Sequence, residues 1–542
     1  MGQPFSFYNG KTARPPDNLG MKKKRRTPKP VFKEYNQDQM WLLPPSIDEL
    51  VPQNHVVRTV NQAIDAMNID FMLSRYRGGG CSSYHPKMML KVLIYAYTQK
   101  IYTSRMIAKA LRENVHFMWI AGRNRPDFRT INRFRAQMMH EMIEKVFSAV
   151  VELLLEKGFV SFEHYFLDGT KIEAASNKYT FVWKKSVEKN KAKLEEKIKE
   201  TLARIDEAND EENRRYGERD LEEMGEDAEV TAAEIEEVVK RLNEELNKKD
   251  DAENEKKELK TVEEEYLPRL KKYEDQLEIC GVRNSYSKTD HDATFMRMKE
   301  DHMLNGQLKP GYNVQIGTQN RFILGYSVHQ KPTDTTTLIP HIEKVKQQTG
   351  HIPATVVADA GYGSEENYAY LEKKQIDSYV KFNFFHMENK RKFRNNPFRK
   401  ENLPYDSRTD SFTCPAGQRL NFSHTKNRTS DNGYAQTLRV YECEDCRWCR
   451  SRTICHSSRL NRRIEMNPVL DAFRAKAREK LTSETGRKLR ARRAVEVETV
   501  FGDIKQNRMF RRFLLRGIQK VGIEWGLICT AHNFLKMNQA MA

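Results

Sequence analysis

Residues 164–174 read HYFLDGTKIEA, and this stretch decides the architecture. Aromatic and apolar residues lead directly into Asp168, and Gly169 then lets the chain turn. This pattern predicts a core strand with a carboxylate in its C-terminal part. Residues 354–363 read ATVVADAGYG and have the same form, with Asp359 at the end of a buried strand and glycines after it. We therefore expect two aspartates at the ends of two strands.

The segments around these aspartates indicate how the strands connect. The expected elements, in chain order, are strands 311–317 and 322–328, helix 335–348, helix 367–374 and strand 377–382. Early strands joined by a tight turn are antiparallel, whereas strands joined through helices are parallel. The fold class is therefore predicted to be α/β, with a mixed sheet.

Carboxylates that end adjacent strands could face one another. Buried carboxylates close together repel, and a divalent cation between them relieves that repulsion. Hard oxygen ligands suit Mg²⁺ or Mn²⁺. Two such ions about 4 Å apart serve both the attacking and the leaving oxygen of phosphoryl transfer, and they need a further carboxylate.

A third carboxylate is available in the basic, helix-like segment 489–505. Glu498 and Lys505 are seven residues apart, so they share a helix face. Glu496 and Asp503 have the same spacing on another face, which leaves Glu496 as the alternative to Glu498.

The charge is unevenly distributed along the 542 residues. Lys and Arg number 93 against 75 Asp and Glu, a net charge of +18. Residues 184–279 hold 21 Lys and Arg against 32 Asp and Glu, so the rest of the chain is far more basic than the total suggests. A polyanion, with nucleic acid first, is the expected partner. No run of 18 apolar residues predicts a membrane span, and residues 1–10 lack the apolar core of a signal peptide, so we expect a cytoplasmic protein.

Length and composition predict several domains. Residues 1–40 form a disordered arm with a basic run at 22–26, and residues 184–279 form an acidic coiled-coil hairpin whose apolar residues recur at helical spacing. The remaining predicted parts are a helical domain over 41–158, a catalytic core over 159–183, 280–385 and 470–538, and a Cys-rich module over 386–469.

The helical domain contains a candidate helix-turn-helix. A helix over 104–112 and a second over 127–135 flank a turn-rich gap. The second helix places Arg129, Arg133 and Arg135 where they could face outward, towards a major groove. A plain helical bundle with a basic surface would give the same pattern.

Three separated motifs resemble those of bacterial insertion-sequence transposases of the DDE type. They are FLDGTKIEA at Asp168, VVADAGYGSEEN at Asp359 and VEVETVFGDIKQNRMFRRFLLRG at Glu498. A glutamate and a lysine separated by six residues belong to that group's signature. The chain departs from the family in one place, because an arginine often stands four residues before the glutamate and here that place holds Ala494.

The resemblance implies a ribonuclease-H-like core with Asp168, Asp359 and Glu498 as metal ligands, and Lys505 as a DNA contact. It implies metal-dependent cleavage and strand transfer of double-stranded DNA at element ends and target, at the nucleoid. Dimerisation is expected because two element ends must meet. Basic residues near the last motif, among them Arg511, Arg512 and Arg516, are further expected phosphate contacts. A catalytically inactive DNA-binding relative and a nuclease without joining activity are the alternatives.

Five cysteines have metal-ligand spacing. They are Cys414, Cys443, Cys446, Cys449 and Cys455. In a cytosolic chain such spacing favours a tetrahedral Zn²⁺ site over disulfides. Five candidates for four places leave the ligand set open, with His424 and His456 as possible substitutes and an iron–sulfur cluster as the rival.

Overall fold

The computed structural model describes residues 46–541 except 69, 75–82, 141, 178, 217–230, 248–252, 299–305 and 431. The predicted basic arm, residues 1–40, therefore lies outside the described residues. Residues 47–542 form one compact unit. No helix in the described part of the chain is long and apolar enough to cross a membrane.

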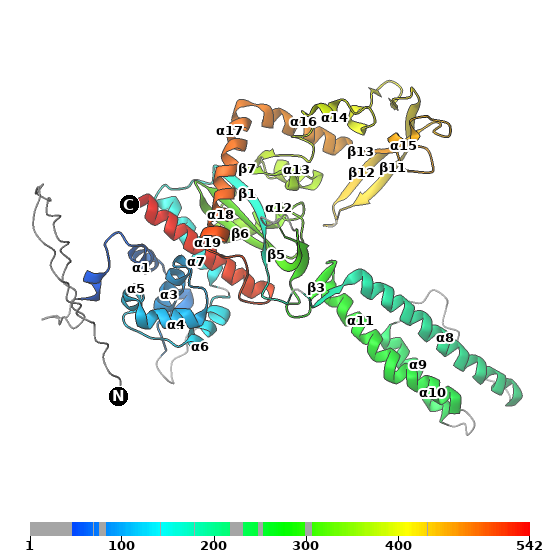
Figure 1. Cartoon of the computed structure of the whole chain (residues 1–542), viewed down its shortest axis with the longest axis horizontal. Coiled ribbons are helices and arrows are strands. Elements are labelled where there is room, and N and C mark those ends of the chain that lie inside the picture. The colour runs from blue at the N-terminus through cyan, green and yellow to red at the C-terminus, as the bar shows by residue number, and fades with distance from the viewer. Residues whose placement is uncertain are drawn as a thin grey trace, which may run out of the picture. The chain divides into compact units, whose positions relative to one another are not determined.

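A six-stranded mixed sheet lies at the centre (Figure 1). Its strands are β1 (His164–Glu173), β4 (Thr294–Arg297), β5 (Leu308–Gln319), β6 (Phe322–His329), β7 (Thr355–Ala358) and β8 (Asp377–Val380). The order is β4-β5-β1-β7-β8, with β6 paired to β5. β5 is antiparallel to β1 and β6, whereas β7 is parallel to β1 and β8. The predicted mixed α/β sheet is confirmed.

Helices cover the sheet, whose central strands are largely buried although β5 also carries polar residues such as Asn313 and Gln315. All four residues of β7 are buried, as are the last ten of β5. The helices in contact with it include α7 (Ile143–Glu156), α12 (Leu338–Thr349), α13 (Glu365–Lys373) and α19 (Ile518–Met541). Tyr326 of β6 packs edge-on against Phe147 of α7, within one continuous apolar core.

The N-terminal helices match the predicted helical pattern, with one addition. They are α1 (Val56–Ala66), α2 (Asp70–Leu73), α3 (Pro86–Thr98), α4 (Ser104–Glu113), α5 (Val115–Ile120) and α6 (Phe128–Arg133). The short α5 was not predicted, and it separates α4 from the turn-rich gap. α6 still packs against α4.

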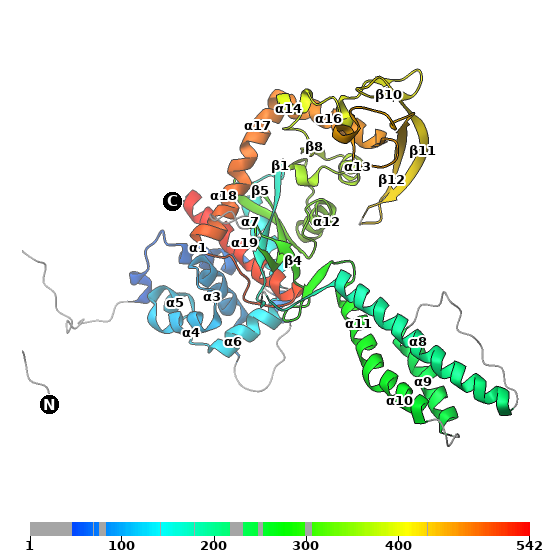
Figure 2. The ribbon, with the colours of Figure 1, turned by 45° about the vertical axis from the view of Figure 1, so that its right-hand side comes forward.

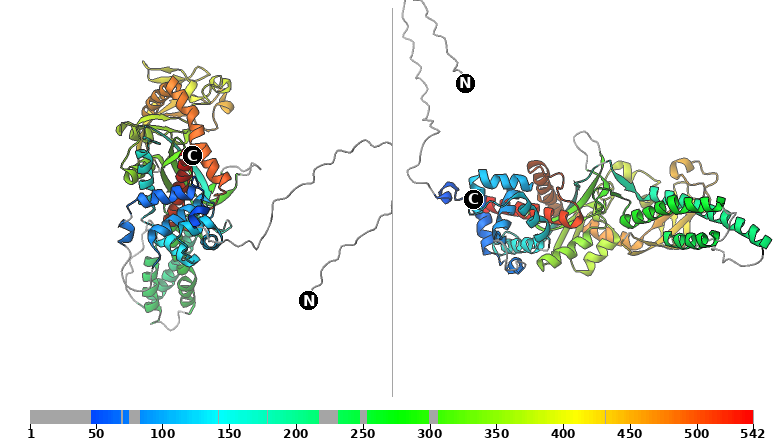
Figure 3. Two further views of the ribbon diagram at one scale, coloured as in Figure 1. Left: turned by 90° about the vertical axis from the view of Figure 1, so that its left-hand side faces the viewer. Right: turned by 90° about the horizontal axis from the view of Figure 1, so that it is seen from below.

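The described parts of residues 184–280 form helices with their own apolar core. They are α8 (Lys184–Tyr216), α9 (Ala232–Leu246), α10 (Glu253–Thr261) and α11 (Leu267–Cys280), with a π turn between the last two. Figures 1 and 3 show α8 running beside the other three. Leu194, Ile198 and Leu242 lie in the shared cluster, as the helical spacing predicted. The antiparallel strands β2 (Phe181–Trp183) and β3 (Ser285–Ser287) pair where this bundle begins and ends.

The Cys-rich region contains a second, antiparallel sheet. Its strands are β9 (Tyr405–Asp406), β10 (Ser411–Thr413), β11 (Arg419–Thr429), β12 (Ala435–Cys443) and β13 (Arg463–Met466). Figure 2 shows β11 and β12 as a long hairpin. The short helix α15 (Arg452–Cys455) lies between β12 and β13, and α16 (Pro468–Thr482) and α17 (Glu484–Arg493) lead back towards the central sheet.

Candidate active site

The two strand-end aspartates lie on adjacent strands. β1 and β7 are parallel, and Leu167 pairs with Ala358 in their register. Asp168 and Asp359 each follow one residue after that pair, so the register places them side by side. Glu498 ends the π turn η6 (Ala494–Glu498), which contacts β1 and β5.

A single buried guanidinium brings the three carboxylates together. Nη2 of Arg493 lies 2.9 Å from Oδ2 of Asp168 and 3.8 Å from Oδ2 of Asp359. Its Nη1 lies 3.7 Å from Oε1 of Glu498. The Arg493 side chain is only 7% exposed, whereas that of Glu498 is 60% exposed. Solvent therefore reaches the site at Glu498 and is excluded from the side that Arg493 occupies.

The π turn explains how Arg493 reaches this place. Arg493 precedes Glu498 by five residues, and an ordinary α-helix would carry the two side chains to different faces. A π turn closes its hydrogen bonds over five residues instead of four. The extra residue returns Arg493 to the side of Glu498. No pattern of residue types signals this turn, which is why the sequence did not predict a role for Arg493.

Burial and neighbouring charges shift the pKa values of the two aspartates in opposite directions. Burial raises the pKa of Asp168 to about 6, and the nearby Asp359 and Asp334 carboxylates add to this against the opposing effect of Arg493. Burial also opposes ionisation of Asp359, but Arg493, the Ala360 amide and Lys381 outweigh it and lower the pKa of that carboxyl. Lys381 Nζ lies 3.3 Å from Asp359 Oδ1.

Asp334 is a fourth carboxylate beside the site, and the sequence did not single it out. It lies between β6 and α12, outside any strand or helix. A Cβ placed on Gly169 would lie 2.7 Å from Asp334 Oδ1, so only glycine fits beside Asp168 here. A residue in a loop belongs to no hydrophobic pattern of a helix or strand. Only its contacts in the folded protein could have identified it.

Glu496, the alternative to Glu498, lies in the interior. Its side chain is 5% exposed. Oε1 accepts a hydrogen bond from Arg492 Nε at 2.9 Å, and Oε2 accepts one from the Arg321 amide at 2.7 Å. Asp503 on the same face pairs with the buried Arg508 at 2.9 Å. These contacts give Glu496 and Asp503 structural partners.

Three of the predicted basic residues in the last motif contact β1 or the residues just after it. Lys505 Nζ donates to Thr170 Oγ1 and to the Lys171 carbonyl, both on β1 beyond Asp168. Arg512 Nε donates to the Ala174 carbonyl at 3.0 Å, and Arg516 Nε to the Ala175 carbonyl at 2.7 Å. Arg511, Arg512 and Arg516 remain exposed.

The candidate recognition helix is only partly arranged as predicted. Arg129 and Arg133 of α6 are exposed. Arg135 is 3% exposed, and its Nη1 donates to the Tyr102 carbonyl at 2.6 Å. Arg135 therefore points into the protein. It stands four residues after the buried Ile131, which places it on the core side of the helix.

The five predicted cysteines line one small cavity of about 20 Å³, together with His456 and Arg462. The Arg462 amide lies 3.4 Å from Cys446 Sγ, and Arg462 Nη1 lies 3.2 Å from Cys455 Sγ. Both ring nitrogens of His456 are buried without a hydrogen-bond partner. His424 lies exposed on β11 and does not line the cavity.

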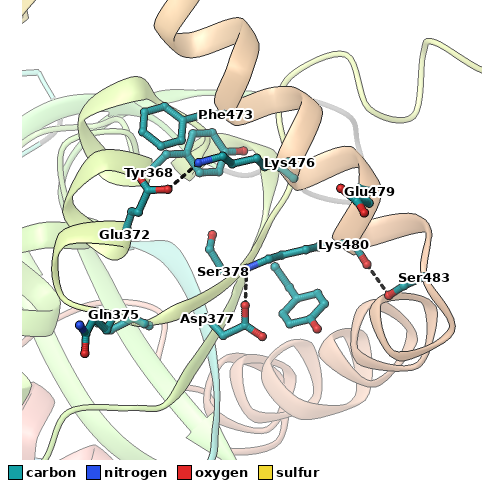
Figure 4. Close-up of a pocket in the computed structure, with 13 residues that line it drawn as sticks. Tyr368, Glu372, Gln375, Asp377, Ser378, Phe473, Lys476, Glu479, Lys480 and Ser483 are labelled. Carbon is teal, nitrogen blue, oxygen red and sulfur yellow. Dashed lines mark hydrogen bonds and ion pairs between the residues drawn. The ribbon is translucent and has the colours of Figure 1, made fainter.

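Neither the carboxylates nor the cysteines form a preassembled metal site. Within the described ranges, no three His, Cys, Asp or Glu residues are grouped closely enough to hold an ion. A larger cavity of about 600 Å³ lies between β8, α13 and α16. The ion pairs Lys476–Glu372 and Lys480–Asp377 line it (Figure 4), and none of the three clustered carboxylates does.

Comparison with known protein families decides the identity of the chain. Residues 413–538 match the model described as "Transposase DDE domain", and this range includes Arg493, Glu498 and Lys505. Residues 45–137 match a second model, "Transposase domain (DUF772)". Both matches support an insertion-sequence DDE transposase. The transposase catalyses DNA cleavage and strand transfer in DNA transposition. No curated protein and no solved structure matches it.

Proposed function

We propose that Asp168, Asp359 and Glu498 are the catalytic carboxylates of this transposase and that they hold Mg²⁺ or Mn²⁺. The observation that carries the proposal is their convergence on the buried guanidinium of Arg493. Family transposases generally use such a divalent metal. Carboxylate oxygens are its preferred ligands, and the excess negative charge beside Asp168 is what a divalent cation would neutralise.

The chain's own residues would divide the work. The three carboxylates would hold the divalent metal, while Lys505 and the exposed arginines after it would hold the flanking phosphates. A bound Mg²⁺ supplies charge stabilisation to the phosphate and favours ionisation of the attacking oxygen. Water is the nucleophile for cleavage, and the freed 3′-hydroxyl is the nucleophile for strand transfer. The reaction then needs no Ser, Tyr or Cys nucleophile.

The architecture proposed with this function is a ribonuclease-H-like core. Segments 159–183, 280–385 and 470–538 would form the core, and 184–279 and 386–469 would be insertions in it. The central mixed sheet supports this division, as do the separate apolar clusters of the α8–α11 bundle and the Cys-rich sheet.

DNA contacts and dimerisation complete the proposal. The exposed Arg129 and Arg133 on α6, with Arg511, Arg512 and Arg516 near the site, are the proposed phosphate contacts. Arg135 is left out because its guanidinium is bonded inside the protein. Two element ends must be held together for strand transfer, so the active complex is proposed to be a homodimer, with the α8–α11 bundle as one candidate interface.

The cysteine cavity is proposed to hold Zn²⁺ with a structural role. Two observations support this proposal. Five cysteines line one cavity, and both ring nitrogens of His456 in the same lining are buried with no hydrogen-bond partner among the described residues. A tetrahedral metal ion would be a partner for such groups. Elemental analysis of protein purified without added zinc tests this. About one equivalent is expected, and less than about half an equivalent would count against the site.

The catalytic assignment is tested with Asp168→Asn and Asp359→Asn. Each variant should bind DNA that carries the element ends, because the protein's positive surface is unchanged, but should fail to nick it with Mg²⁺. Asp377→Asn is the matched control, since Asp377 lies on β8 of the same sheet and pairs with Lys480 at the surface, away from the three carboxylates. Nicking by either site variant would refute the assignment.

A further inference from the structure

Asp334 is held beside the catalytic carboxylates by two neutral amides. Its Oδ1 accepts hydrogen bonds from Asn313 Nδ2 at 2.8 Å and from Gln315 Nε2 at 2.9 Å. Both donors belong to β5, the strand paired with β1, where Gln315 lies opposite Gly169. We call these two amides, of Asn313 and Gln315, the amide clamp. Gln315 lies opposite the residue that follows Asp168, so the clamp is directly beside the catalytic strand.

The amide clamp has a fixed orientation. Gln315 Oε1 accepts a hydrogen bond from the buried Tyr362 hydroxyl, so the Gln315 NH₂ group must point towards Asp334. Gln315 Nε2 also donates to Asn313 Oδ1 at 2.9 Å, which fixes the Asn313 amide in the same way. Asn313 and Gln315 are both essentially fully buried. This amount of ordered, buried hydrogen bonding is more than a surface loop needs to hold its shape.

The clamp uses only one oxygen of the carboxylate. Asp334 Oδ2 makes no hydrogen bond and no ion pair within the ranges that the structure describes. The clamping donors are neutral, so the charge of Asp334 is not cancelled by them. An acceptor oxygen held in place and left without a partner is suited to a cation.

The position of Asp334 links it to both catalytic aspartates. The glycine that follows Asp168 has no room for a Cβ because Gln315 and Asp334 occupy that space. Gly361, two residues after Asp359, also faces Asp334, and a Cβ there would lie 3.6 Å from Oδ2.

We propose that Asp334 is a fourth carboxylate of the metal site, contributing an oxygen ligand to a divalent cation held with Asp168. The inference rests on the proposed metal-binding role of the three catalytic carboxylates. A fourth carboxylate would also increase the number of protein oxygen ligands. Hard divalent cations take six or more oxygen ligands each, and three carboxylates provide few of them when two ions are bound.

Metal binding without DNA tests the inference independently of activity. Mn²⁺ titrations of the full chain, followed by the electron paramagnetic resonance signal of free Mn²⁺, would compare wild type with Asp334→Asn, Asp168→Asn and Asp377→Asn. The asparagine at 334 keeps an acceptor oxygen for both clamping amides, so the fold should persist. We expect Asp334→Asn to weaken Mn²⁺ binding by about tenfold or more, within the range for residues that support metal ligands. The Asp377→Asn control should bind like wild type.

The outcomes separate the two proposals. Wild-type Mn²⁺ affinity in Asp334→Asn, together with weakened binding in Asp168→Asn, would overturn the role of Asp334 alone. Wild-type affinity in both variants would overturn the metal site itself. A second measurement needs no variant: Fe²⁺ with ascorbate and peroxide cuts a protein backbone next to a bound ion. Cuts near residue 334 as well as near 168 and 359 are expected, and their absence near 334 would refute the proposal.

Discussion

Replacing Arg493 by glutamine should show whether the guanidinium and a divalent cation stabilise the same carboxylates. In the metal-free protein Arg493 is the positive charge nearest to Asp168, and the pair is largely buried, with side chains 7% and 20% exposed. Removing one partner of a buried pair costs about 3–5 kcal/mol. Asp359 and Glu498 are half exposed or more, so water screens their share and about 3 kcal/mol is the expected loss.

This loss should appear as a lower melting temperature that Mg²⁺ restores. For a catalytic unit of ordinary size, about 3 kcal/mol corresponds to a fall of roughly 6–12 °C. In wild type the cation must displace the guanidinium, whereas in Arg493→Gln the carboxylates are already free to bind it. Millimolar Mg²⁺ should therefore stabilise the variant more than wild type, and the gap between them should shrink by at least half.

Thermal melts in excess EDTA and in Mg²⁺ measure both effects. Lys488→Gln is a suitable control, because Lys488 lies on the same helix, α17, with its side chain 75% exposed. The control should melt like wild type in both conditions. A loss in Arg493→Gln that Mg²⁺ leaves unchanged would show that the guanidinium does not stand in for a cation, and would refute the reasoning.

Three further predictions follow from contacts at and beneath the site. Glu496→Gln should lower stability by about 2 kcal/mol, since the buried Glu496 carboxylate accepts two hydrogen bonds. Glu498→Gln should instead melt like wild type and lose DNA nicking. The reverse pattern in thermal melts and nicking assays would exchange the roles of the two glutamates. Gly169→Ala should abolish nicking because its Cβ would meet Gln315 at 2.1 Å, whereas Gly502→Ala, with open space around it, should be neutral or slightly stabilising; an active Gly169→Ala variant would contradict the packing. Burial lowers the pKa of His329 to about 4, so the unfolded chain binds the proton first and this side chain alone should lower stability by about 2 kcal/mol as pH drops from 8 to 5. Because Asp168 and His341 also titrate with shifted pKa values, the measurement is the difference in that fall between wild type and His329→Asn in denaturant titrations, and an equal fall in both proteins would contradict the assignment.

The sequence predicted the central sheet because its strands carry strong local signals. Apolar runs that end in Asp and Gly marked β1 and β7, and a turn between apolar segments marked the β5–β6 pair. Parallel pairing then places strand ends at one edge, so the proximity of Asp168 and Asp359 could be anticipated.

Other features depend on contacts that no local pattern reveals. Helix α19, 24 residues long, has polar and apolar residues mixed around its whole surface, with Glu524 and Asn533 buried, so it has no apolar stripe that an amphipathic pattern could detect. Arg135 was expected to face outward as part of a run of arginines, whereas its guanidinium is hydrogen-bonded to the Tyr102 carbonyl inside the protein. Arg493 and Asp334 gain their positions from the register of a distorted helix and from packing across β5.

The π turn before Glu498 has a consequence for how relatives of this transposase should be aligned. A one-residue insertion is usually placed in a loop, since helices tolerate it poorly. Here the additional residue is absorbed inside a helix by one wider turn, and the residues before and after it keep their direction. An alignment that counts positions back from the glutamate would equate Ala494 with the family's arginine. An alignment gap opened between Arg493 and Glu498 equates the two arginines instead.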